Sequence, residues 1–121
     1  MWNGKTTMEK KYKIPGEQIR ELIKSAIGCI ASDTITVGGE LVGYMYRDEP
    51  EDESDSGWRF LSGLEDQEYA DDPNNFAFYR INTIANYDPA ILPYIDYPVG
   101  SLLVRTEGTN EFELEPSDSQ E

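Results

Sequence analysis

Apolar side chains recur with a helical spacing near the start of the chain. Between residues 19 and 27 they fall at i, i+3, i+4, i+7 and i+8, the pattern of one face of an α-helix. Glu17 suits the first turn of such a helix, and Gly28 suits its end. Residues 1–13 show no apolar period. We therefore expect a flexible basic arm over 1–13, followed by an amphipathic helix that ends before Gly28.

The rest of the chain is rich in strand-forming residues. Residues 29–37 and 41–47 flank Gly38-Gly39, and this predicts a hairpin, because glycines accept the positive φ angles of tight turns. Gly43 within the second strand indicates a bulge or a close neighbour. Further strands are predicted over 58–61, 76–81, 99–105 and 111–115. Exposed polar stretches are expected over 48–57 and 62–75, the second with a helical turn near 65–69. Short helices are predicted over 82–87 and from Pro89.

This order of elements predicts the α+β class. We expect an N-terminal helix packed on a mostly antiparallel sheet, with short helices and long acidic loops. The 121 residues suit a single domain, placed over 14–115, with a disordered acidic tail over 116–121. The longest apolar run has four residues and no signal peptide is readable, so a cytoplasmic protein without a membrane segment is expected.

The composition excludes several kinds of chemistry. Histidine is absent and Cys29 is the single cysteine, so a Ser-His-Asp triad, a histidine-ligated metal and an internal disulfide are all impossible. Neither a Walker A motif nor a GxGxxG after a strand is present. We expect no cofactor, no metal and no catalytic residue, with Cys29 an inert core thiol.

The charge is segregated. The net charge is −14, and residues 48–72 hold eleven acidic side chains against Arg59 alone. Such a surface disfavours direct contact with nucleic acid or anionic membranes and favours a basic protein partner. The candidate partner-binding residues are Asp48, Glu49, Glu51, Asp52, Glu53, Asp55, Trp58, Glu65 and Asp66.

Each candidate also has a simpler interpretation. The loop carboxylates could serve solubility alone, and Trp58 could be a core residue at a strand start. A calcium loop would place Asp52 at its first position, but its twelfth would then be Gly63, which lacks a carboxylate. The arginines of the strands (Arg47, Arg59 and Arg80) are expected to pair with nearby carboxylates. The polar group Asn82, Asn86, Tyr87 and Asp88 is expected to cap helices and close turns rather than bind a ligand.

Five segments of the chain resemble one bacterial family. They are GCIASDTITVGGELVGYMYRDEP, DSGWRFLSGLED, DDPNNFAFY, NTIANYDPAIL and PVGS, in this order within residues 27–105. Together they resemble immunity protein family thirty-three of polymorphic toxin systems, formerly a domain of unknown function. The resemblance implies an α+β domain with a prominent tryptophan, mapped to Trp58, in a cytoplasmic protein that binds and neutralises a cognate toxin. It implies no catalytic residue.

Several functions remain open at this point. The first hypothesis is a non-catalytic immunity protein whose acidic surface occludes a basic toxin, such as a nuclease. The alternatives are a scaffolding or regulatory domain, a DNA mimic that occupies a DNA-binding protein, and a carboxylate-based hydrolase. The hydrolase would need two carboxylates roughly 5–9.5 Å apart in a concave apolar pocket. The oligomeric state, a cation in the acidic loop, and ordering of arm and tail on binding stay open.

Overall fold

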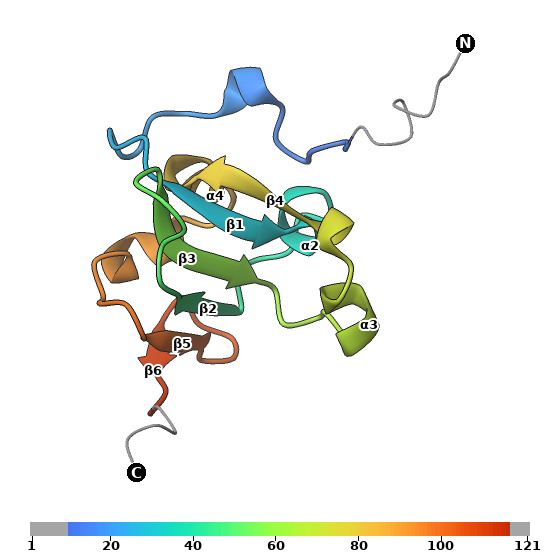
Figure 1. Ribbon diagram of the computed structural model, residues 1–121. Helices are drawn as coiled ribbons and strands as arrows, with labels where there is room; N and C mark the ends of the chain where they lie inside the picture. The colour runs from blue at the N-terminus through green and yellow to red at the C-terminus, as the bar shows by residue number, and fades with distance from the viewer. Residues whose placement is uncertain (1–9, 117–121) are drawn as a thin grey trace.

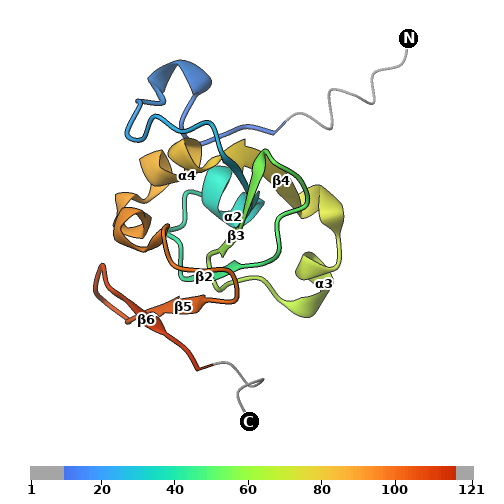
Figure 2. The same cartoon turned by 60° about the vertical axis from the view of Figure 1, so that its left-hand side comes forward.

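The computed structural model describes residues 10–116 and contains one six-stranded sheet, one face of which is covered by the helices of residues 33–36 and 81–87 (Figures 1 and 2). The strands are β1 (Gly28–Ser32), β2 (Tyr44–Arg47), β3 (Asp55–Leu61), β4 (Phe76–Arg80), β5 (Leu102–Arg105) and β6 (Phe112–Leu114). The α-helices are α2 (Asp33–Thr36), α3 (Gln67–Ala70) and α4 (Ile81–Tyr87), and the 3-10 turns are η1 (Gly16–Gln18), η2 (Pro73–Asn75) and η3 (Pro89–Tyr94).

The sheet has the order β4-β1-β3-β2-β5-β6. The neighbours β1 and β3 run parallel, and every other pair is antiparallel. The α+β class and the mostly antiparallel sheet are therefore confirmed. No helix in the described part of the chain is long and apolar enough to cross a bilayer.

One face of the sheet carries the core. Successive strand residues point to opposite faces, and the core-facing set packs against α2, α4 and η3. The fully buried strand side chains are Cys29, Ala31, Met45, Trp58, Phe60 and Leu103, and the helical layer adds Ile35, Ile81, Ile84, Ala85 and Ile91. Cys29 is buried as expected, and its burial raises the pKa of the thiol.

The predicted N-terminal helix is wrong. Beyond the short turn η1, residues 19–27 run without a helix over α4. The Leu22 and Ile23 backbone N–H groups donate to Asn82 Oδ1 at 2.6 and 3.0 Å, and the Arg20 carbonyl accepts from Asn82 Nδ2 at 2.9 Å. Asn86 also binds the Arg20 backbone. The asparagines of α4 therefore take the hydrogen bonds that a helix would make within itself.

The hairpin predicted around Gly38-Gly39 is also wrong. The β1 strand ends at Ser32, whose hydroxyl accepts from the Thr34 N–H and starts α2. Gly39 has φ +81° and donates to the Ile35 carbonyl at 3.0 Å, so it ends this helix instead of turning a hairpin. The β2 strand then pairs with β3 and β5.

The later elements follow the predictions more closely. The strands near 58–61 and 76–81, the helical turn near 65–69 and the terminal hairpin are all present as β3, β4, α3 and β5–β6. Asp88 accepts from the Ala90 N–H and caps η3 as expected. Gly43 does meet a close neighbour, because a Cβ there would lie 2.3 Å from the Ser62 carbonyl oxygen.

The predicted arm and tail fall mostly on residues 1–9 and 117–121, which lie outside the described residues. Residues 10–13, which the prediction assigned to the arm, contact α2. Lys10 Nζ lies 2.8 Å from Asp33 Oδ1, and the Lys13 N–H donates to the Thr36 carbonyl at 2.8 Å.

Candidate partner-binding surface

The densest negative charge lies on the hairpin between β2 and β3. We call residues 48–54 the acidic loop. All seven are exposed, and they include Asp48, Glu49, Glu51, Asp52 and Glu53. At the base of the loop Gly57 has φ +93°, and a Cβ there would lie 2.1 Å from the Asp48 carbonyl oxygen. Glycine is therefore required where the two strands close beneath the loop.

None of these five carboxylates is held in an ion pair within residues 10–116. The ion pairs of that part join Lys10 to Asp33, Arg59 to Asp55 and Arg105 to Asp88. The acidic loop is therefore a concentrated charge that the described chain does not neutralise.

Asp55 is different from the loop residues beside it. It is buried and holds Arg59 through two hydrogen bonds, of 3.0 and 2.9 Å. Its carboxylate also accepts from the Glu51 and Gly57 N–H groups. Hydrogen bonding from Arg59 lowers the pKa of Asp55 well below its usual range and raises that of Arg59. Asp55 therefore closes the hairpin and presents no free carboxylate to a partner.

Trp58 is a core residue. Its side chain is completely buried, its Nε1 donates to the Ile95 carbonyl at 2.9 Å, and its ring stacks on Phe60. The Arg47 guanidinium lies 5.7 Å from the ring centroid. The simpler interpretation of Trp58 is therefore the one that the structure shows.

Glu65 and Asp66 lie at the opposite end of β3 from the acidic loop, and only Asp66 is exposed. Glu65 accepts from the Thr34 hydroxyl and from the N–H groups of Ser62 and Gly63. Burial alone would raise the pKa of Glu65, but these hydrogen bonds outweigh it and lower the pKa to about 2. Asp66 is exposed and caps α3 by accepting from the Tyr69 N–H.

The remaining arginines do not make the expected ion pairs. Arg47 donates to the carbonyls of Ser56 and Tyr97, and Arg80 donates to those of Ile23 and Ser25. The expectation of ion pairing is confirmed for Arg59 alone. The Tyr97 carbonyl that accepts from Arg47 lies fifty residues away in the sequence, so no local pattern reveals it.

The sequence analysis missed a surface on the uncovered side of the sheet. We call it the open face, and its residues alternate with those of the core along the strands. It comprises Ile30, Tyr44, Tyr46, Arg59, Leu61, Phe76, Phe78, Leu102 and Val104. Phe78 is 53% exposed. The placement of Phe76 and Phe78 on either side of Ala77, on one face of β4, was the available signal, but the pairing of β4 with β1 could not be predicted.

The hollow on the open face does not supply the pair of carboxylates that a hydrolase would need. The hollow on the open face that borders Tyr46 and Phe76 has no acidic lining residue. The two carboxyls with shifted pKa values, Asp55 and Glu65, are both shifted downward, opposite to what a general acid at neutral pH needs. Within residues 10–116 no cluster of three or more His, Cys, Asp or Glu side chains could hold a metal ion.

This α+β domain matches the family model described as the immunity protein Imm33 domain, over residues 29–115. The match spans most of the chain, from β1 to just beyond β6, and the chain belongs to this family. No curated protein and no solved structure matches it. The family of immunity proteins implies a toxin as the partner and is generally non-enzymatic.

Proposed function

We propose that this chain is a non-catalytic immunity protein that binds and neutralises a cognate basic toxin, such as a nuclease, through its acidic loop. Membership of the Imm33 family carries the immunity function. The exposed, unneutralised carboxylates of residues 48–54 support the basic character of the toxin. Asp66, which is exposed just before α3, adds negative charge at the opposite end of β3, whereas Asp55 and Trp58 are buried beneath the loop.

The negative charge of the acidic loop should act mainly on the rate at which the partner associates. Clustered charges of one sign steer a complementary partner and raise its rate of association, and salt screens the effect. A nuclease must present a cationic surface to its substrate phosphates. An immunity protein that covered this surface with carboxylates would block the substrate without catalysis of its own.

The test replaces the five loop carboxylates by amides. The variant carries Asp48→Asn, Glu49→Gln, Glu51→Gln, Asp52→Asn and Glu53→Gln. Its probe is the toxin domain encoded at the same locus, with binding kinetics and protection of cells as readouts. We expect the association rate constant to fall about tenfold or more at low ionic strength, because steering of this size is typical of clustered charges.

A matched control removes five exposed carboxylates elsewhere, with Glu17, Glu21, Glu40, Glu107 and Glu111 each changed to Gln. It alters the net charge by the same amount and should bind almost as well as the wild type. Equal losses in both variants would mean that net charge alone matters and not the acidic loop. A wild type that neither binds nor protects would overturn the immunity function, and capture of a housekeeping protein instead would favour a scaffolding domain or a DNA mimic.

A further inference from the structure

We propose that the open face of the sheet is the docking floor for the toxin, and that it receives a basic segment carrying a protruding apolar side chain. This inference rests on the proposed immunity function and adds the place and chemistry of contact. Helices α2 and α4 cover the other face of the sheet, as Figure 2 shows, whereas α3 reaches only the margin of the open face, where Tyr69 packs against Phe76. Most of the open face is therefore left without a covering helix within residues 10–116.

The floor is hollowed beside Tyr46. One hollow, of about 280 Å³, is mainly apolar and lies against Ile30, Leu61 and Phe76. The other, of about 460 Å³, combines Leu61 and Leu102 with the polar side chains of Arg47, Asp48 and Ser101. Phe78 projects beside them at 53% exposure. Contiguous apolar surface rimmed by polar residues marks interaction sites in soluble proteins, and each hollow could receive one large side chain.

The floor is also held in place before any partner arrives. Arg59 at its centre is fixed by the bidentate contact with Asp55. The Phe78 ring lies over Gly28, where a Cβ would come within 2.1 Å of it. The Tyr44 and Tyr46 rings pack with centroids 5.9 Å apart. A preordered floor loses little side-chain entropy on binding.

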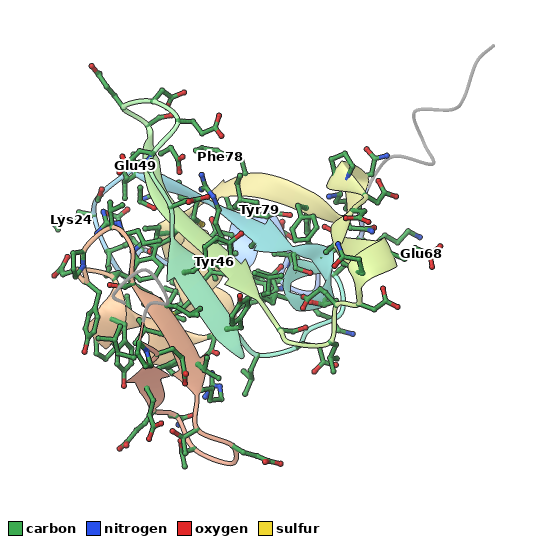
Figure 3. The ribbon with its side chains drawn as sticks, turned by 60° about the horizontal axis from the view of Figure 1, so that its bottom comes forward. Lys24, Tyr46, Glu49, Glu68, Phe78 and Tyr79 are labelled. Carbon is green, nitrogen blue, oxygen red and sulfur yellow. The ribbon has the colours of Figure 1, made fainter. Side chains whose placement is uncertain are left out.

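Negative charge stands at both ends of the floor. The acidic loop precedes β3, and the segment 65–72 follows it with Glu65, Asp66, Glu68, Asp71 and Asp72. Ala70 of α3 lines the smaller hollow, which places this second acidic segment at the rim. Figure 3 shows Glu49 and Glu68 on opposite sides of Tyr46.

The nearby cations offset this charge only in small part. Arg59 is neutralised by Asp55, and Arg80, at the end of β4, keeps its charge while it donates to the carbonyls of Ile23 and Ser25. The occupant that complements the surface is therefore basic at its ends and apolar at its centre. A second copy of this chain fits poorly, because each copy would bring a net charge of −14.

The test changes the most exposed ring of the floor. Phe78→Ser should weaken binding of the locus-encoded toxin domain roughly 10- to 100-fold, the loss typical of a large apolar side chain that becomes buried on binding. The matched control is Leu22→Ser, because Leu22 is 43% exposed on the segment that crosses α4, on the other side of the sheet. The control should bind as the wild type does, and both variants should keep a cooperative thermal transition.

Salt separates this inference from the acidic-loop proposal. The loss in Phe78→Ser should persist at high ionic strength, since it removes apolar contact, whereas the loss from the five loop amides should shrink. Wild-type affinity in both Phe78→Ser and Leu22→Ser would overturn the docking floor while leaving the acidic loop in place. Absence of binding by the wild type would overturn both proposals.

A photo-crosslink identifies the occupant directly. p-Benzoylphenylalanine in place of Phe78 should form a covalent adduct with a lysine- or arginine-rich peptide of the toxin, and the same group in place of Leu22 should not. An adduct with residues 1–9 of the same chain, or with a second copy, would assign the floor to that occupant and overturn the proposal.

Discussion

At the scale of single residues, Asp55 shows how one carboxylate can differ from its neighbours in sequence. It belongs to the densest acidic run of the chain, yet it is 4% exposed and bound to Arg59. Asp55→Asn would leave the Arg59 guanidinium without its counter-charge. We expect a loss of about 3 kcal/mol in the free energy of unfolding, at the low end for such pairs because the open face lies close to water.

Urea denaturation measures this loss, and Glu53→Gln is its control. Glu53 is exposed in the same hairpin and has no ion pair among the described residues, so its change should stay within about 0.5 kcal/mol. Equal effects of the two changes would show that Asp55 is an ordinary loop carboxylate.

Glu65 provides a second test at this scale, through pH. Its pKa is about 2 in the folded protein and its ordinary value is 4.5, so the unfolded chain binds the proton more readily. The stabilisation is therefore complete above pH 4.5 and is lost as the pH falls toward 2. Glu65→Gln should flatten the unfolding free energy against pH in this window. A slope as steep as in the wild type would assign the acid sensitivity to other carboxylates.

At the scale of elements, the segment over α4 depends on tertiary hydrogen bonds. Asn82→Ala would remove the acceptor of the Leu22 and Ile23 N–H groups and the donor to the Arg20 carbonyl. We expect a loss of about 2 kcal/mol in the free energy of unfolding, because these backbone groups lose their partners. Amide exchange at Leu22 and Ile23 should quicken, whereas Asn74→Ala, at an exposed position of η2, should leave it unchanged.

The same segment explains what the sequence could predict and what it could not. Its apolar spacing is helical, but the spacing does not record that Asn82 and Asn86, some sixty residues later, offer hydrogen bonds in the place of the helix. Likewise Gly38-Gly39 suits a hairpin and a helix end equally well by its φ angles. An element such as η3 could be predicted, because the residues that start it, Asp88 and Pro89, lie directly at its beginning.

In the candidate surface, too, some features could be predicted from local sequence and others depend on contacts between distant segments. The exposed acidic loop follows from composition, since so many carboxylates cannot be buried together. The burial of Asp55 and Trp58 depends on β3 being the central strand beside β1, a pairing between distant segments. The open face depends on that pairing as well, because its residues come from β4, β1, β3, β2 and β5.

At the scale of the whole molecule, the charge of −14 should oppose folding. Repulsion among the five carboxylates of the acidic loop finds no compensating ion pair within residues 10–116. We therefore expect the unfolding temperature to rise between about 20 mM and about 300 mM salt, as screening shortens the range of the repulsion. The five-amide loop variant should be as stable as the wild type or more so at low salt, with a weaker dependence on salt.

This outcome bears on why the loop is so acidic. If the five carboxylates served stability, their neutralisation would lower the unfolding temperature, and thermal scans at both salt concentrations would detect it. If the variant gains stability while it loses toxin binding, the five carboxylates lower the stability of the fold and serve binding instead. Such a loss of stability is typical of functional sites. This outcome would therefore place the binding function on the exposed carboxylates beside the open face.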